Sequence, residues 1–199
     1  ASDGKIVLFD FIKEIKKNRT RYDSHCASLR IINVIKFCSR YQIDIPEFNS
    51  FVFSQALYVR KNSEVHLSNN HLLENGFALL FASHFFGHEK LFHYSSKVLM
   101  KALDKQVLAD GAHFELCPMY HLWTVNRLLE CLQILKKSSF KVKSFVDVLE
   151  KKVSAMLGWI IQMQFANGSL PAVNDSSEGY GPGINAILKI AYVIGLKAS

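Results

Sequence analysis

Two short polar segments interrupt an otherwise apolar, periodic sequence, and both carry side chains that can take part in proton transfer. Residues 68–75 hold Asn70 and His71, and residues 110–121 hold Tyr120. The apolar spacing that follows each segment predicts that both lie at the start of a helix. Because the N–H groups at a helix start are unsatisfied and carry partial positive charge, they stabilise anions, and Asn70 and His71 there could bind and neutralise a carboxylate.

The phenol of Tyr120 completes a set of groups suited to one class of reaction. In the first turn of a helix its phenolate would be favoured, which predicts a pKa closer to that of a useful acid or base. An amide, an imidazole and a phenol around a carboxylate suit the removal of a proton alpha to that carboxylate. The alternative is structural: Asn69 or Asn70 caps the helix, and Tyr120 packs with a hydrogen-bonded hydroxyl. Spacing alone leaves both interpretations open.

A third polar segment, residues 167–176, contains Asn174 and Asp175. We expect both at the same rim as Tyr120, shaping their loop more than acting on a substrate, because Asn and Asp side chains readily bond to their own turns. If successive helical hairpins stack with the same sense, the starts of the two helices lie at one end of the bundle. Asn70, His71 and Tyr120 would then face one cleft.

Helical periodicity runs through almost the whole chain, and strand patterns are nearly absent. Pro46 and Pro118 suit the first turn of a helix, and Gly87 suits a C-terminal stop. Helices joined by short turns pair naturally as antiparallel hairpins, so the sequence predicts an all-α domain. The predicted helices cover a short segment around residues 9–16 and then about 24–42, 46–59, 70–86, 89–108, 118–137, 144–165 and 184–196.

Composition narrows the class of protein. The chain has 199 residues, of which 49% are hydrophobic, and 24 Lys and Arg against 17 Asp and Glu give a net charge of +7. These values fit one sizeable core and exclude disorder, collagen-like repeats and a disulfide-dense mini-protein. The positive charge favours a polyanionic partner. No nucleic-acid-binding signature accompanies it, so nucleic acid is not expected, and no segment suits a membrane-spanning helix.

Histidine and cysteine positions give no strong metal signature. His84 and His88 are four residues apart but lack the glutamate of a zincin motif. His113, Cys117 and His121 are also four apart, yet the proline and glycine around them argue against one continuous helix. We expect no metal site and no cofactor. The four cysteines are widely spaced and are predicted to be buried or half-buried free thiols.

Several segments together form a more specific pattern. They are residues 28–33 (SLRIIN), 70–76 (NHLLENG), 106–121 (QVLADGAHFELCPMYH) and 170–176 (LPAVNDS). In this order and at helical-hairpin distance they resemble the heparinase II/III-like polysaccharide lyases. The resemblance covers about residues 20–195.

The resemblance implies a fold and a domain organisation. Members of this superfamily have an N-terminal α/α-toroid followed by a C-terminal β-sandwich that helps to complete the cleft. We therefore expect residues 1–199 to form a single helical domain, an incomplete α/α-toroid of antiparallel hairpins, and to be a fragment that lacks the sandwich. We also expect the fragment alone to bind acidic glycan weakly and to turn it over poorly or not at all.

The resemblance also implies a reaction. The family removes the C5 proton of a uronic acid and expels the sugar linked at C4, which leaves a C4–C5 double bond. Carried over to this chain, Asn70 with His71 would neutralise the uronate carboxylate, and Tyr120 would protonate the leaving oxygen. His71 and His121 are candidate bases, and a tyrosine also serves as the base in some relatives, so the identity of the base stays open. The same carry-over implies substrate-binding roles for Asn69, His121, Asn174 and Asp175.

The implied partner is an acidic, uronate-containing polysaccharide, and the resemblance favours a periplasmic or secreted protein. The kind of polysaccharide (heparin or heparan, alginate, or a capsule-type glycan) and the oligomeric state stay open. The competing interpretation is a non-catalytic helical module that binds an acidic glycan or a protein partner in a concave face. Appearance of unsaturated uronate would separate the lyase from the module.

Overall fold

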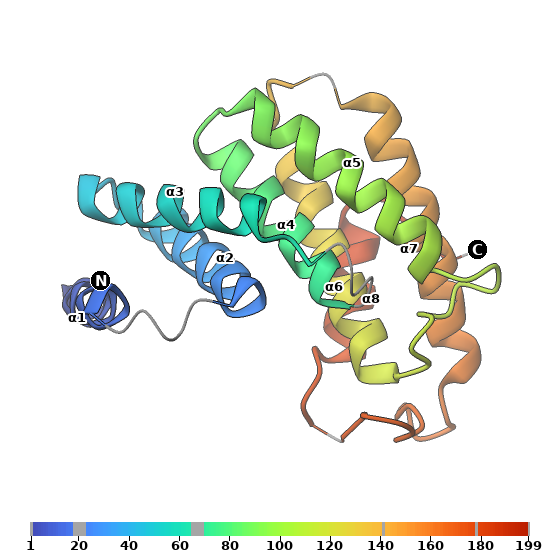
Figure 1. Ribbon diagram of the computed structural model, residues 1–199. Helices are drawn as coiled ribbons and strands as arrows, with labels where there is room; N and C mark the ends of the chain where they lie inside the picture. Colours follow the sequence, from blue (N-terminus) through green and yellow to red (C-terminus); the bar gives the residue numbers. More distant parts are fainter. Residues whose placement is uncertain (1, 18–22, 65–69, 141, 178, 199) are drawn as a thin grey trace. The chain divides into compact units, whose positions relative to one another are not determined.

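The computed structural model describes residues 2–17, 23–64, 70–140, 142–177 and 179–198 (Figure 1). Over these residues the chain forms helices and no β-strand, so the all-α prediction is confirmed. Their sole extended pairing is an isolated bridge between Val107 and His113. The helices are α1 (Ser2–Lys17), α2 (Ser24–Tyr41), α3 (Pro46–Lys61), α4 (Asn70–Phe85), α5 (Glu89–Gln106), α6 (Pro118–Leu135), α7 (Lys143–Met163) and α8 (Ile184–Val193).

Local signals account for most of these helix ends. Pro46 and Pro118 begin α3 and α6 as predicted, and Gly87 follows α4 with a φ of 61°. The first helix is longer than predicted, since it begins at Ser2 rather than near residue 9. Asp3 in its first turn and lysines in its last turn suit the helix dipole along this greater length.

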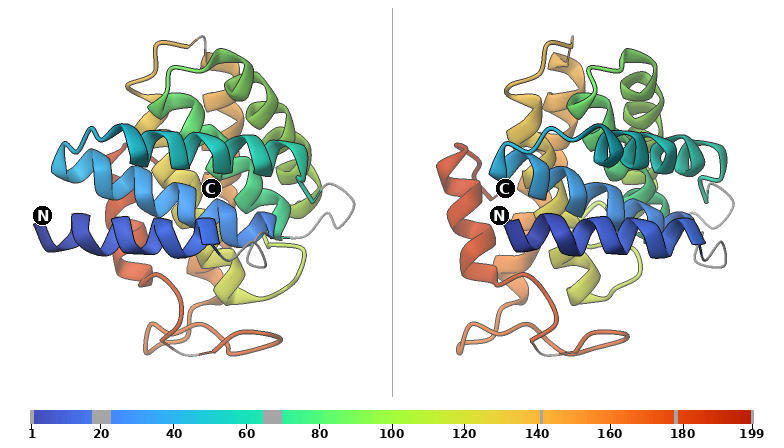
Figure 2. Two further views of the ribbon diagram at one scale, coloured as in Figure 1. Left: turned by 60° about the vertical axis from the view of Figure 1, so that its left-hand side comes forward. Right: turned by 90° about the vertical axis from the view of Figure 1, so that its left-hand side faces the viewer.

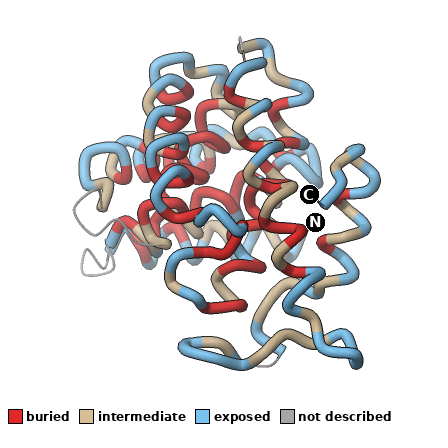
Figure 3. The backbone as a smooth tube through the Cα atoms, turned by 90° about the vertical axis from the view of Figure 1, so that its right-hand side faces the viewer, coloured by how far each residue is buried: buried red, intermediate tan, exposed pale blue. Residues whose placement is uncertain are grey.

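The chain divides into two compact units, unit 1 (Ala1–Ser95) and unit 2 (Ser96–Ser199), and the boundary falls within α5. The prediction of a single domain over residues 1–199 stays a prediction. Each unit buries its own apolar residues. Figure 3 shows buried positions recurring between exposed ones along the helices, as a three- to four-residue periodicity predicts.

In unit 1, α4 is the most buried helix, and α2 and α3 pack against it. Every residue from Leu72 to Ser83 is buried except Glu74, which is half-buried. Asp23 caps α2, because its carboxylate accepts a hydrogen bond from the Cys26 N–H at 2.7 Å. Figure 2 shows α1, α2 and α3 side by side. The starts of α2 and α4 are thus both fixed by a packed core.

In unit 2, α6 packs against α7 and α8. Gly111, in the turn after α5, has a φ of 89°, and a side chain there would collide with the backbone of Ala155 in α7. This close approach sets the path of residues 107–117 into the start of α6.

No described helix is both long and apolar enough to span a membrane. All four cysteines are free thiols, as predicted. Cys38, Cys117 and Cys131 are buried, but Cys26 is exposed, so its predicted burial is wrong. Cys26 lies in the first turn of α2, on the face that points away from the core.

Candidate functional site

The predicted carboxylate-binding residues lie at the start of α4 in unit 1. Asn70 is the first residue of the helix and is half-buried. His71 follows it, and its side chain is 38% exposed. Asn69, the third residue predicted here, lies outside the described residues. The start of α4 therefore presents an amide, a partly exposed imidazole and the unsatisfied N–H groups of a first turn.

Two further side chains surround the imidazole of His71. The ring of His25, in the first turn of α2, stacks on it with 4.1 Å between ring centroids and 21° between planes. The carboxylate of Glu64 lies on another side, with Oε1 3.6 Å from His71 Nδ1. Neither residue is predicted from the sequence, because neither belongs to the motif that contains His71 and only the tertiary packing brings them to it.

A buried hydrogen-bond chain holds this cluster in place. The side chain of Asn75 is 0% exposed. Its carbonyl oxygen accepts a hydrogen bond from the Glu64 N–H at 3.0 Å, and its amide donates to the Ser28 hydroxyl at 3.0 Å. Ser28 in turn donates to the carbonyl of Ser24 at 2.7 Å. Asn75 thus links Glu64 to α2.

The electrostatics of the cluster favour neutral imidazole on His25. Burial lowers the pKa of His25, and the neighbouring His71 lowers this pKa further. The carboxylates of Asp23 and Glu64 act in the opposite direction but do not reverse the shift. His25 is therefore uncharged at neutral pH, so the stacked rings do not form a pair of cations.

The predicted acid, Tyr120, lies in the first turn of α6 in unit 2. Its hydroxyl donates a hydrogen bond to Asp175 Oδ2 at 3.4 Å. Burial and the negative charge of Asp175 raise the pKa of Tyr120. The predicted direction, towards the phenolate, is therefore wrong, because burial and a carboxylate that is distant in sequence both favour the protonated phenol. The phenol keeps its proton at neutral pH, which is the state that a proton donor needs.

The loop that carries Asp175 is fastened to the segment before α6. Asn174 donates its side-chain amide to the carbonyl of Leu116 at 2.7 Å. Both residues have positive φ values, 52° and 50°, a conformation that non-glycine residues adopt only when their surroundings impose it. The Ser176 hydroxyl accepts the Met119 N–H at 3.0 Å. Asn174 and Ser176 therefore shape the loop, and Asp175 contacts Tyr120.

His121 occupies a very different place from the one the resemblance implied. Its side chain is 1% exposed, and its ring stacks on Trp159 with centroids 4.5 Å apart. Its Nδ1 accepts the His113 N–H at 3.3 Å, and its Nε2 donates to the carbonyl of Met156 at 3.0 Å. Burial lowers the pKa of His121 to about 4. With both nitrogens engaged in the core, His121 does not fit the roles of substrate-binding residue or base.

His113 is buried in the same way. Its side chain is 1% exposed, its Nε2 lies 3.3 Å from the side-chain oxygen of Gln106, and burial lowers its pKa to about 4. No group of His, Cys, Asp and Glu side chains within the described ranges could hold a metal ion. In residues 110–121, the His121 ring thus bonds to two backbone groups, and the His113 ring contacts the buried side chain of Gln106.

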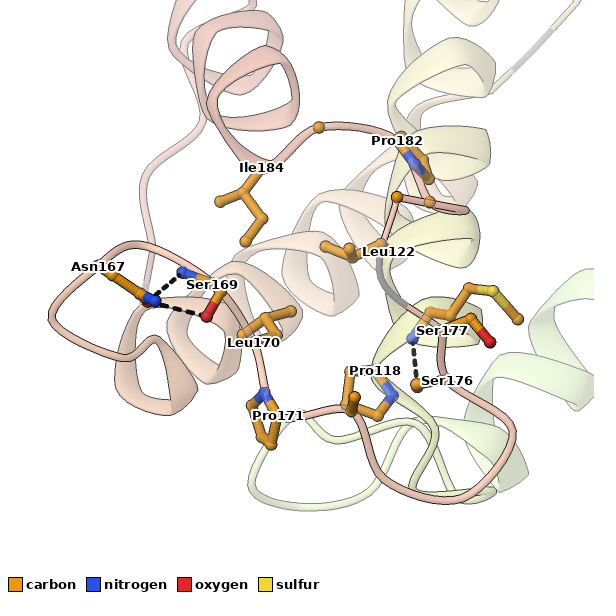
Figure 4. A pocket seen from close by; sticks show the side chains of 15 residues that line it. Pro118, Leu122, Asn167, Ser169, Leu170, Pro171, Ser176, Ser177, Pro182 and Ile184 are labelled. Atoms are coloured by element: carbon orange, nitrogen blue, oxygen red, sulfur yellow. Dashed lines mark hydrogen bonds between the residues drawn. The ribbon is translucent and has the colours of Figure 1, made fainter.

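A pocket of about 470 Å³ lies beside the start of α6 in unit 2 (Figure 4). It opens between that helix, the loop after α7 and the start of α8. Most of the lining is apolar, and its polar groups are an amide and a few hydroxyls. The lining residues are Pro118, Met119, Leu122, Asn167, Ser169, Leu170, Pro171, Ala172, Ser176, Ser177, Gly179, Gly181, Pro182, Gly183 and Ile184.

The structure thus brings His71 together with His25 and Glu64 in unit 1, and Tyr120 together with Asp175 in unit 2. That Asn70, His71 and Tyr120 face one cleft stays a prediction.

Comparisons with known proteins give two positive findings. A family model described as "Heparinase II/III N-terminus" matches residues 8–188. The crystal structure of heparinase III is similar to this chain, with a TM-score of 0.76 and 18% sequence identity over 94% of this chain and 33% of that one. This chain therefore spans about a third of the length of that protein, and the likeness shows the fold. No curated protein matches the chain.

Proposed function

Because the chain belongs to the heparinase II/III N-terminal family, we propose that it is the helical part of a lyase that cleaves uronate-containing polysaccharide by β-elimination. One observation carries the proposal: each of the two predicted helix starts bears a side chain that can take part in proton transfer. The partly exposed imidazole of His71 lies at the start of α4, and the protonated phenol of Tyr120 lies at the start of α6.

The first task in such a reaction is to make the C5 proton acidic. The amide of Asn70 and the N–H groups of the first turn of α4 would bind the uronate carboxylate and disperse the negative charge that develops at C5. His71 is adjacent and would take up the C5 proton on its Nε2. His121, the other candidate base, is buried and engaged at both nitrogens, so His71 is the base we propose.

The second task is to let the C4 substituent leave. As the proton departs, the electron pair of the C5–H bond forms the C4–C5 double bond, and the C4–O bond breaks. The pair from that bond goes to the glycosidic oxygen, which takes the phenolic proton of Tyr120. Solvent then takes the proton from His71 and returns one to Tyr120. Asp175 would orient the phenol until the leaving oxygen replaces it as hydrogen-bond acceptor.

Charge and family membership support the proposed substrate class. A net charge of +7 attracts a polyanion and raises the rate of encounter with it. A periplasmic or secreted location belongs to the same proposal, since long acidic polysaccharides occur outside the cytoplasm.

The test is the ultraviolet absorbance of unsaturated uronate when heparin, heparan sulfate, alginate and other uronate glycans are mixed with the protein. We expect the 199-residue chain to bind acidic glycan weakly and to turn it over poorly, and a longer chain that contains these residues to give the chromophore. Binding by the longer chain without any chromophore would contradict the lyase and support the non-catalytic module.

A variant tests the role of the phenol directly. Tyr120→Phe removes only the hydroxyl, so kcat should fall far more than substrate affinity. Tyr180→Phe is the matched control, because Tyr180 is 73% exposed and has no part in the proposed chemistry. An unchanged rate in Tyr120→Phe would show that this tyrosine is not the acid.

A further inference from the structure

We propose that Glu64 and His25 are positioning residues that hold the His71 imidazole in one orientation and one tautomer, with its proton on Nδ1 and its basic nitrogen at Nε2. This inference rests on the proposed function, in which His71 takes up the C5 proton. It gives a role in the proposed reaction to two residues that lie outside the motif containing His71.

Glu64 determines which nitrogen carries the proton. Its Oε1 lies 3.6 Å from His71 Nδ1, slightly farther than a hydrogen bond, and a carboxylate this close attracts an N–H and repels a nitrogen lone pair, so it favours the proton on the nitrogen that faces it. The Glu64 side chain is only 18% exposed, and its Oε2 is buried without a hydrogen-bond partner among the described residues. A desolvated carboxylate gains most from a nearby donor. This places the ring proton of His71 on Nδ1.

The position of Glu64 is itself fixed. Its backbone N–H donates to Asn75 Oδ1 at 3.0 Å, and Asn75 lies one helical turn beyond His71 on α4. The amide of Asn75 also donates to Ser28 on α2. The carboxylate is therefore attached through a fully buried side chain to the same helix that carries the imidazole, which limits how far the two can move apart.

His25 restricts the orientation of the ring. A ring stacked with centroids 4.1 Å apart and planes within 21° cannot rotate about its χ2 angle without losing the contact. The charged and titratable groups that face His25 are Asp23, Glu64 and His71. Because burial lowers the pKa of His25, the stack consists of a neutral ring against the base.

Together the two residues do for His71 what a buried carboxylate does for the histidine of a catalytic triad: they select the tautomer and aim the basic nitrogen. The contact is longer here and partly exposed. We therefore expect the loss of Glu64 to lower kcat by about tenfold or more, rather than by the four orders of magnitude known for a triad, and to leave KM nearly unchanged.

Nuclear magnetic resonance of the 199-residue chain with ¹⁵N-labelled histidine tests the tautomer without any substrate. We expect His71 to show a protonated Nδ1 in the wild type and to shift towards the Nε2-protonated form in Glu64→Ala. His25→Ala should broaden the His71 ring signals. Glu47→Ala, an exposed glutamate on α3, is the matched control and should change nothing. Circular dichroism shows whether each variant keeps its helices.

Two outcomes overturn the inference. One is a wild-type His71 with its proton on Nε2, and the other is a tautomer that Glu64→Ala leaves unchanged in a folded chain. Kinetics of an active longer chain separate this inference from the proposed function. If Tyr120→Phe abolishes turnover but Glu64→Ala does not affect it, the lyase stands and the positioning role fails. If the tautomer is as expected but no uronate glycan is cleaved, the positioning role stands and the lyase fails.

Discussion

Acid should destabilise this protein through two buried histidines of unit 2. Burial lowers the pKa of His113 to about 4 and that of His121 to about 4, whereas an unfolded chain titrates near the ordinary value of about 6.5. Between these values the unfolded state binds more protons than the folded state. Stability is therefore fully present above pH 6.5 and is lost as the pH falls towards 4.

The size of the effect follows from the shift. For one histidine with these two pKa values, the free energy of unfolding falls by about 2 kcal/mol between pH 7 and pH 5, and by about 3 kcal/mol between pH 7 and pH 4. The two histidines together should lower the free energy of unfolding by about 4 kcal/mol between pH 7 and pH 5, which is a large part of the stability of a typical domain. The physical reason is explicit at His121, because protonation would turn Nδ1 from an acceptor into a donor facing the His113 N–H.

Urea unfolding at pH 7 and pH 5 measures the effect. A loss of about 4 kcal/mol should lower the midpoint by roughly 2 M urea. Burial also lowers the pKa values of His25 and His84, which act in the same direction. His113→Gln should flatten the pH dependence, whereas His93→Gln should not, because the His93 side chain is 64% exposed. Equal midpoints at the two pH values would refute the assignment of buried, neutral imidazoles.

Three further predictions concern single contacts, and urea unfolding at pH 7 measures each of them. Gly111→Ala should lower the free energy of unfolding by at least about 2 kcal/mol, because Gly111 has a positive φ and a methyl group there would collide with the backbone of α7. Gly87 also has a positive φ, but a methyl group there meets no other atom, so Gly87→Ala should lower it by only about 1 kcal/mol. Asn75→Ala removes one buried and one part-buried hydrogen bond and should lower the free energy of unfolding by about 2–3 kcal/mol. A decrease below about 1 kcal/mol would show that these bonds hold nothing in place. Ser176→Ala removes the acceptor for an N–H of the first turn of α6 and should cost about 1 kcal/mol.

Local patterns predicted the helices because helix ends depend on neighbouring residues. A proline at a first position, a glycine just past the end and a three- to four-residue apolar spacing were enough for α3, α4 and α6. Residue types at helix starts also picked out Asn70, His71 and Tyr120 as candidates. Each of these inferences uses information within one or two helical turns.

Long-range contacts could not be predicted in this way. The pKa of Tyr120 is raised rather than lowered because the fold partly buries the phenol and brings Asp175, which is distant in sequence, to the hydroxyl. The partners of His71 are equally remote, since His25 comes from α2 and Glu64 precedes α4. Tertiary packing determines these contacts, and a local sequence motif contains no information about them.

Membership of a motif does not make a histidine a base. His71 and His121 both belong to segments that resemble the lyase family, yet their surroundings differ. His121 is 1% exposed, and both of its nitrogens bond to the protein. A proton could reach it only if the core opened. His71 is 38% exposed and has a carboxylate beside Nδ1, so a ligand can approach the ring while its other side is held. Exposure and the second nitrogen's partner therefore separate a candidate base from a histidine that supports the backbone.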